Sequence, residues 1–467
     1  MAALATCAAL ALDRLSLATY SAPYAEAPLK PPAATLRSTP MHSCIAATLC
    51  AVVLTGCHGD KRFAEDHLEL SGDTKLETTA GYVVGIGFVY ITKEKDAFSV
   101  HAGSKVFGPY KDSPKVEISE NHQAYAFVAG SEGKRVLVHN GAEVGTGCHA
   151  DPALSRDGKD VACVTGKSAA ITISGGRVMR RNCVADEASV MKNGLPGKAS
   201  YDEVCGLTMG ISGTSAFLAR RDNKWLVIRD GSEIGSEYAD VKDLGICEDG
   251  RVVYAARTDG GWSVAVDGVL GPRFEAVANL ICRGATYAYW AVSKDRSIVL
   301  GHNGETSTKA YDDVGPVMLS ADGAHLAHRA IKGNEQYFVV DGVAKRAYRD
   351  GVEQDAKQHP GVSPWLSVDG SGVTLIGPGG SGVAVVEQGK TVATYDEVTD
   401  VAPVARTVIV VGKRGDRMGI SLRDQPLGEY DDIVDVAVSE NGKEFAFVVR
   451  EGRVLRRVRK RYGLIGW

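Results

Sequence analysis

The chain has 467 residues, of which 44% are hydrophobic and 24% charged, with a formal net charge of −4 and a pI near 6.3. This composition argues against an intrinsically disordered protein, and the charge provides no basic footprint for nucleic acid. Glycine occurs 54 times, above an average share of roughly 7%, which is typical of a turn-rich, all-β chain.

Residues 1–56 are interpreted as an export leader rather than as structure. The stretch MHSCIAATLCAVVLTGC, residues 41–57, contains an apolar segment of roughly a dozen residues, which fits a secretory signal and is too short to span a bilayer. Its end, Leu54-Thr55-Gly56-Cys57, resembles the lipobox of bacterial lipoproteins. That resemblance implies cleavage before Cys57, a lipid on this cysteine, and a linker over residues 57–70.

Because His58 and not aspartate follows Cys57, the resemblance to lipoproteins further implies an anchor in the outer membrane. The protein would then be exported and face the periplasm or the cell surface. Two alternatives stay open: an ordinary cleaved signal, and a translation start at Met41 rather than Met1 that would make residues 1–40 a mis-assigned start.

Six cysteines remain after the leader, and they predict disulfides because an even number in an exported chain is typical of such bonds. They are Cys148, Cys163, Cys183, Cys205, Cys247 and Cys282. Cys247 and Cys282 have almost the same offset in consecutive repeats and form a candidate pair. Buried free thiols are the alternative. Since no CxxC spacing occurs, we predict no metal site.

An aromatic residue followed by acids recurs along the chain. Tyr201, Tyr238, Phe274, Tyr311 and Tyr348 are spaced by 37, 36, 37 and 37 residues, and Tyr395 and Tyr430 continue the series with less regular spacing. A fixed period in this range indicates a repeat architecture.

Each repeat also carries two tight-turn signals. Ser-x-Asp/Asn-Gly ends at Gly158, Gly323, Gly370 and Gly442, with Cys247 replacing the serine before Asp249-Gly250. β-Branched runs end in Asp/Asn-Gly at Gly141, Gly231, Gly268, Gly304 and Gly342. Both dipeptides tolerate positive φ and favour hairpins, so each unit is expected to be four short antiparallel strands.

Small sheets of this kind bury both faces only by stacking on copies of themselves, and closing the series removes exposed ends. We therefore predict an all-β fold, a β-propeller of four-stranded repeats of about 37 residues over residues 71–467, with about 8 to 10 units.

The succession Y-D-x-V, S-x-D-G-K and vvvDG resembles the WD40-like, TolB-type propeller repeats of bacterial envelope proteins, most clearly from Tyr201 to Asp350. WG-type repeats are the alternative. The resemblance implies a non-catalytic scaffold in the envelope that binds protein partners or senses a ligand.

The acids after each recurring aromatic residue are expected to form a ring on one face of the propeller. They are Asp202, Glu203, Asp240, Asp312, Asp313, Asp396, Glu397, Asp431 and Asp432, with Glu275 and Asp350 at the same repeat position. Such a ring would favour a basic protein segment or divalent ions. The alternative is that these acids form turns and solvated strand ends.

Catalytic motifs were not found. Gly377–Gly382 fits GxGxxG, but a strand and not a helix follows it, so we predict a hairpin loop. His325 and His328 are three apart in a predicted strand and therefore face opposite sides. We predict no enzyme and no cofactor. The alternative is a hydrolase acting on envelope glycan or peptide, since a propeller can assemble a site from distant residues.

Three segments interrupt the regular pattern. Residues 177–200 and 353–364 lengthen connections, and such loops are candidates for specificity. The basic segment 453–467 is expected to form a last strand that closes the ring with the N-terminal unit. Attraction to anionic lipid is its alternative role.

Overall fold

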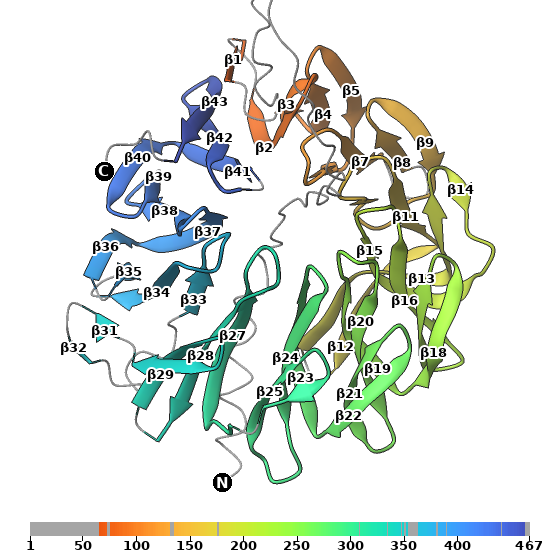
Figure 1. Cartoon of the computed structure of the whole chain (residues 1–467). Coiled ribbons are helices and arrows are strands. Elements are labelled where there is room, and N and C mark those ends of the chain that lie inside the picture. Colours follow the sequence, from red (N-terminus) through yellow and green to blue (C-terminus); the bar gives the residue numbers. More distant parts are fainter. Residues whose placement is uncertain are drawn as a thin grey trace, which may run out of the picture.

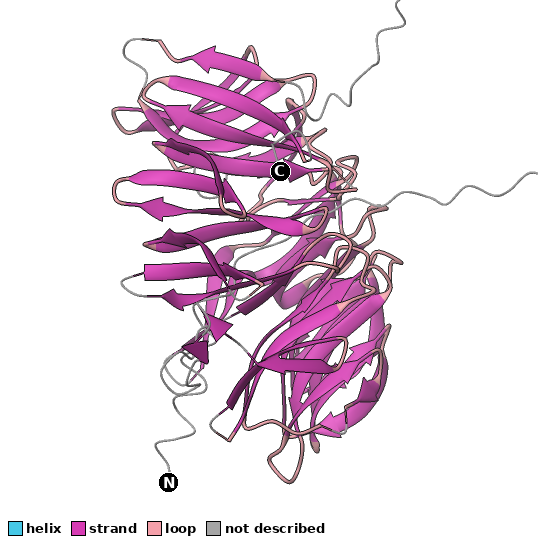
Figure 2. Ribbon diagram, turned by 60° about the vertical axis from the view of Figure 1, so that its left-hand side comes forward, coloured by secondary structure: helices cyan, strands magenta, loops and turns pink. Residues whose placement is uncertain are grey.

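The computed structural model describes residues 65–462, except residues 72–74, 131–134, 175–176, 308, 334, 347, 350–351, 354–362, 380–381, 389 and 440. This part of the chain forms strands, turns and loops, and no helix (Figure 2). Consequently, no helix capable of crossing a bilayer occurs within these residues. The predicted leader and Cys57 lie outside the described residues.

Ten four-stranded units, or blades, succeed one another around a closed ring (Figure 1). In the described part of the chain, eight are separate four-stranded sheets, and blades 3 and 4 are joined in one nine-stranded sheet. The fold is therefore the predicted all-β propeller. Its blade count lies at the upper end of the expected range, and above the ~4–8 blades of typical propellers.

The strands of blades 1 to 5, from innermost to outermost, are β2 (Leu76–Val83), β3 (Gly87–Glu94), β4 (Ala97–Ala102), β5 (Lys105–Tyr110); β6 (Lys115–Ile118), β7 (Tyr125–Ala129), β8 (Val136–His139), β9 (Ala142–Thr146); β10 (Ala153–Leu154), β11 (Val161–Thr165), β13 (Arg177–Lys192), β14 (Leu195–Pro196); β15 (Tyr201–Met209), β16 (Ser215–Arg221), β17 (Lys224–Arg229), β18 (Ser232–Tyr238); β19 (Asp240–Ile246), β20 (Val252–Thr258), β21 (Gly261–Val266), β22 (Val269–Phe274).

The strands of blades 6 to 10 are β23 (Ala276–Arg283), β24 (Thr286–Val292), β25 (Ile298–His302), β26 (Glu305–Thr306); β27 (Asp313–Leu319), β28 (Leu326–Lys332), β29 (Glu335–Val340), β30 (Val343–Arg346); β33 (Ser363–Leu366), β34 (Val373–Gly379), β35 (Gly382–Glu387), β36 (Lys390–Tyr395); β37 (Glu397–Val404), β38 (Thr407–Arg414), β39 (Arg417–Leu422), β40 (Gln425–Tyr430); β41 (Asp432–Val438), β42 (Glu444–Glu451), β43 (Val454–Arg461), β1 (Asp66–Glu69). A small hairpin of β31 (Tyr348–Arg349) and β32 (Val352–Glu353) follows blade 7.

The second strand of each blade explains the apolar runs in the sequence. It lies inside its sheet, and both its faces pack against neighbouring blades, so its residues are apolar without alternation. All five residues of β7 are buried. Between blades 4 and 5, Leu218 and Trp225 pack in one core cluster with Val241 and Tyr254. Complete burial of an aliphatic side chain such as Val241 contributes about 1.5–3 kcal/mol.

The Ser-x-Asp/Asn-Gly segments join the first and second strands. In blade 8, Ser367 Oγ donates to Asp369 at 2.7 Å and accepts from the Gly372 N–H at 2.9 Å. The same pair of bonds recurs at Ser155, Ser320 and Ser439. Ser119, followed by Asn121, makes it too, although no glycine follows to mark the motif in the sequence.

The Asp/Asn-Gly pairs between the third and fourth strands form the predicted tight turns. Asp267 and Gly268 have φ values of 47° and 87°, which a type I′ turn requires. The Asp267 carboxylate accepts the Val252 N–H at 2.9 Å, and Asn303 and Asp341 do the same for Tyr287 and Leu326. The recurring acid or amide therefore ties the hairpin to the neighbouring second strand.

The ring is closed by the N-terminal side of the chain. β1 pairs antiparallel with β43, from Asp66 opposite Arg457 to Glu69 opposite Val454, and supplies the outer strand of blade 10 (Figure 1). The expected closure by the basic C-terminal segment is thus confirmed over Val454–Arg461. The propeller starts at Asp66, inside the stretch expected to be a linker, because blade 10 lacks a fourth strand of its own.

Residues 177–200 do not form the expected loop. β12 (Ser168–Ser174) and β13 make a long hairpin between the second and third strands of blade 3. β13 then pairs with β15, Val184 opposite Val204, which links blade 3 to the innermost strand of blade 4 through the backbone. The second expected insertion, 353–364, lies mostly outside the described residues.

The prediction of disulfides is confirmed. Cys148 is bonded to Cys163, Cys183 to Cys205, and Cys247 to Cys282, the last being the pair suggested by the repeat offset. Cys183–Cys205 fixes the long hairpin to β15. Cys247–Cys282 joins the first turn of blade 5 to β23 of blade 6.

Candidate functional site

The acids expected to form a ring are used largely inside the blades. Asp202, Asp312, Asp396 and Asp431 each accept a backbone N–H from the turn between the second and third strands of their own blade. The Asp312 bond to Gly333 is 2.6 Å long. These carboxylates therefore hold hairpins, which is the role of the alternative interpretation.

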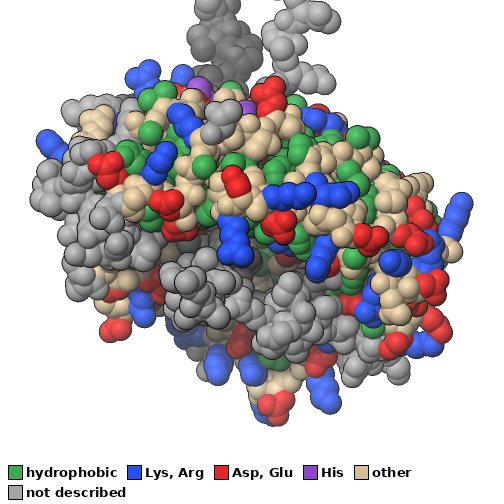
Figure 3. Space-filling model, turned by 90° about the horizontal axis from the view of Figure 1, so that it is seen from below, with side chains coloured by type: hydrophobic (Ala, Val, Ile, Leu, Met, Phe, Trp, Pro, Cys, Tyr) green, Lys and Arg blue, Asp and Glu red, His purple; other side chains and the backbone are tan. Residues whose placement is uncertain are grey.

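Several of the remaining ring acids have arginine partners. Glu203 is 3% exposed and lies 3.1 Å from Arg220, and Asp313 lies 3.0 Å from Arg329. Asp240 accepts the N–H of the next residue, while Glu397 and Asp432 begin the innermost strands of blades 9 and 10. On the side of the molecule shown in Figure 3, acidic and basic side chains are interspersed. Binding of a basic partner by these acids stays a prediction.

A second set of carboxylates, which no motif marked, lies on the innermost strands. Glu117 is on β6, Asp243 on β19 and Asp400 on β37. Burial raises the pKa of all three carboxyls, and Asp151 raises that of Glu117 further. At Asp400 the Val401 N–H partly offsets the effect of burial, and Asp435 adds to it. Lys242 partly offsets the shift at Asp243.

At these three carboxylates, neighbouring cations do not outweigh the effect of burial on the pKa. Asp243 is solvent-exposed although protein surrounds it on most sides, as expected on the inner wall of a ring. It has φ of 55°, where β19 contains one extra residue relative to β20. The bulge turns the side chain out of the alternation of the strand, and the sequence carries no signal for it.

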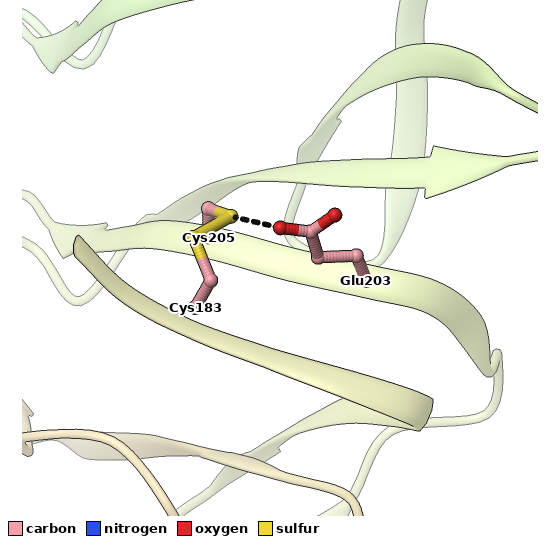
Figure 4. Close-up of side chains that lie close together, drawn as sticks. All are labelled: Cys183, Glu203 and Cys205. Carbon is pink, nitrogen blue, oxygen red and sulfur yellow. Dashed lines mark hydrogen bonds between the residues drawn. A yellow bond between two sulfur atoms is a disulfide. The ribbon is translucent and has the colours of Figure 1, made fainter. Parts of the chain in front are cut away.

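Glu203 also contacts a disulfide (Figure 4). Glu203 and Cys205 are two apart on β15 and therefore share a face, and Cys183 lies opposite on β13. The Glu203 Oε1 to Cys205 Sγ distance is 3.4 Å, and the three potential ligand atoms lie within 4.8 Å of one another. With both sulfurs in the disulfide, neither is a thiolate, so the oxidised site cannot ligate a metal through them.

The glycine-rich segment and the two histidines considered for catalysis lie in strands and turns of blades 7 and 8. The predicted hairpin is confirmed by its strands: β34 ends at Gly379, and β35 begins at Gly382, which lies opposite Gly379. His325 bonds Asp341 at 2.8 Å near the surface, while His328 is buried beside the Trp290 ring. Burial lowers the pKa of His328 to about 4, so it is neutral at physiological pH.

Comparison with known proteins gives structural likeness at low sequence identity. Searches of protein families and of curated proteins find no match. A Dos1 propeller is similar at 10% identity and a TM-score of 0.35, covering 67% of this chain and 93% of the other. TolB from Acinetobacter baumannii gives 12% identity and a TM-score of 0.25, with coverages of 55% and 61%. The assignment as a β-propeller follows from the ten blades themselves.

Proposed function

We propose that this protein is a lipid-anchored envelope propeller that acts as a non-catalytic scaffold and binds a cationic segment of a protein partner. The observation that carries the proposal is the division of the acids into two sets. Most of the recurring carboxylates stabilise turns or pair with arginines, whereas Glu117, Asp243 and Asp400 lie on the innermost strands without an arginine ion pair in the part of the chain that the structure describes, Asp400 also accepting the Val401 N–H at 2.8 Å. The alternative of a hydrolase has no specific observation in its favour among the described residues.

Export to an oxidising compartment is supported by the three disulfides. The lipid anchor and the outer membrane rest on the resemblance of Leu54–Cys57 to a lipobox. Replacement of the lipid acceptor tests this part of the proposal directly.

We expect Cys57→Ser to move the protein from the detergent phase to the aqueous phase in Triton X-114 partitioning of expressing bacterial cells. A thioether-linked diacylglycerol supplies the membrane affinity, which increases by about 0.8 kcal/mol per buried CH₂ group. Cys50→Ser, within the leader, is the control and should partition as the unchanged protein. Equal partitioning of Cys57→Ser and the unchanged protein would exclude lipidation at this residue.

We expect the triple variant Glu117→Gln, Asp243→Asn, Asp400→Asn to bind a lysine-rich peptide about tenfold more weakly, because it removes the inner-wall carboxylates that attract cations. Isothermal titration at two salt concentrations measures the affinity. A matched control changes three exposed acids away from the inner strands by the same charge: Asp96→Asn, Glu143→Gln, Asp259→Asn. If both triple variants lose affinity equally, net charge and not the inner wall attracts the peptide.

A further inference from the structure

Cys183, Glu203 and Cys205 are residue types that bind metal ions, but in this structure the two cysteines form a disulfide. These residues are 2%, 3% and 1% exposed, and they come from two paired strands. Among the described residues, no other group of three or more such side chains lies close enough to hold an ion. Neither Cys148–Cys163 nor Cys247–Cys282 belongs to such a group in the described part of the chain, so Cys247–Cys282 offers an internal control.

We propose that, once the Cys183–Cys205 disulfide is reduced, the two thiolates and the Glu203 carboxylate bind one thiophilic divalent cation of the Zn²⁺ class. Two thiolates and one carboxylate are a ligand set that such ions accept, leaving a fourth position for water. This site is independent of the proposed partner binding, because it faces a different set of residues and needs no partner.

The balance of buried charge favours replacement of the disulfide by a bound metal ion. In the oxidised protein the disulfide is neutral, and the negative charge of Glu203 is balanced by Arg220 at 3.1 Å. In the metal-bound state, two thiolates and Glu203 carry three negative charges, and a divalent ion with Arg220 supplies three positive charges. Both states are therefore neutral overall, so the exchange avoids the cost of an unbalanced buried charge.

Reduction of the disulfide precedes metal binding. A dithiol reductant transfers two electrons and two protons to the protein disulfide: the S–S bond of Cys183 and Cys205 breaks, and the reductant becomes a disulfide. The cation then displaces the two thiol protons to solvent as the two metal–sulfur bonds form. Arg220 is partly exposed, with 37% of its side chain open to solvent, and marks the side from which an ion can enter.

The bound ion would act as a cross-link between two elements of the fold. The Cys183–Cys205 disulfide fixes the hairpin of β12 and β13 to the innermost strand of blade 4. A metal bound by the same two residues replaces one cross-link by another, and would hold the hairpin in place under reducing conditions.

The proposal is tested by titrating the reduced, folded protein with Cd²⁺ as probe and following the ultraviolet absorbance of cadmium–thiolate bonds. We expect one tight equivalent in the unchanged protein and in Cys247→Ser/Cys282→Ser, and its loss in Cys183→Ser/Cys205→Ser. Glu203→Gln keeps both cysteines and should bind about tenfold more weakly.

Two results would overturn the proposal: the tight equivalent persists without Cys183 and Cys205, or the reduced unchanged protein binds no Cd²⁺. Unchanged affinity in Glu203→Gln would remove the carboxylate from the ligand set and overturn the three-ligand site. Glu203→Gln retains the disulfide, so its folding before reduction is secured even where the serine variants fold poorly.

Discussion

Asp435→Asn is expected to lower the free energy of unfolding by about 3 kcal/mol, because it leaves buried positive charge at the ring closure without its anion. Asp435, on β41 of blade 10, accepts the Tyr82 N–H of blade 1 at 2.9 Å and lies 3.5 Å from Nδ1 of His122 in blade 2. The Arg457 guanidinium lies 4.1 Å from the centre of the Tyr82 ring. One carboxylate therefore joins three blades across the closure.

The contribution of this cluster to the free energy of unfolding is lost at low pH through Asp435 and at high pH through His122. Burial alone would raise the pKa of Asp435, but His122, the Tyr82 N–H and Arg457 outweigh it and hold the pKa below its usual range. This contribution is present above the ordinary aspartate pKa and is lost as pH falls through the depressed value. Burial would lower the pKa of His122, but Asp435 and the Tyr82 carbonyl raise it. The His122 contribution is complete below about pH 6.5 and is lost as pH rises through the raised pKa.

Urea unfolding from pH 5 to 9 measures the His122 contribution, and its extension below pH 4 measures the Asp435 contribution. His122→Gln should remove the part of the pH dependence above pH 6.5, and the double variant with Asp435→Asn should cost less than the sum of the two single changes. Asn279 offers the matched control, since it occupies the corresponding bulge of blade 6 and accepts the Val317 N–H as an uncharged amide. Asn279→Asp adds an acid without a histidine partner and should destabilise. Additive effects of the two single changes would contradict a coupled pair.

Loss of one disulfide, in Cys247→Ser/Cys282→Ser, is expected to cost about 3 kcal/mol. The bond closes a segment of 35 residues, so its removal enlarges the conformational freedom of the unfolded chain. The lost stability should be local, since all three bonds lie between Cys148 and Cys282. Amide hydrogen exchange should accelerate in blades 5 and 6 and stay unchanged in blades 8 and 9.

The control for that experiment is Ser263→Ala, which changes a buried serine of β21 in blade 5, leaves the disulfide intact and should cost less than the double serine variant. Uniform acceleration of exchange around the whole ring would show that the blades unfold as one unit rather than locally. In repeat proteins each unit contacts mainly its neighbours, which is the reason to expect a local response.

Local chemistry made the hairpins predictable from the sequence. The Asp-Gly and Asn-Gly pairs between the third and fourth strands, such as Asp267-Gly268, adopt positive φ at both residues. This turn can therefore be predicted from the local sequence alone. The spacing of the aromatic residues likewise marked the start of blades 4 to 7, 9 and 10, whereas Tyr348 begins the small hairpin of β31 and β32, and blade 8 starts later, at Ser363. Cys247 and Cys282 could be paired because the repeat gives both the same offset.

Long-range contacts decided what the sequence could not predict. Asp312 bonds a glycine amide 21 residues later, so the motif alone does not separate a turn-holding acid from a binding acid. Asp243 and Asp435 owe their positions to bulges, which depend on how each strand fits its neighbour and leave no pattern in composition. Cys183 lies in a hairpin without a counterpart in other repeats, and its partner Cys205 could not be inferred from periodicity.

The pairing of β1 with β43 has a consequence for biosynthesis. Asp66 is translated almost four hundred residues before Arg457, on the order of half a minute or more at typical rates of synthesis, yet the two lie opposite each other in one sheet. The contacts that complete blade 10 join segments almost four hundred residues apart, and contacts of such sequence separation form slowly. Until blade 10 is complete, the edge of β2 and the face of Tyr82 that packs against blade 10 are therefore exposed to solvent. A chaperone that shields them until translation ends would raise the yield of native protein.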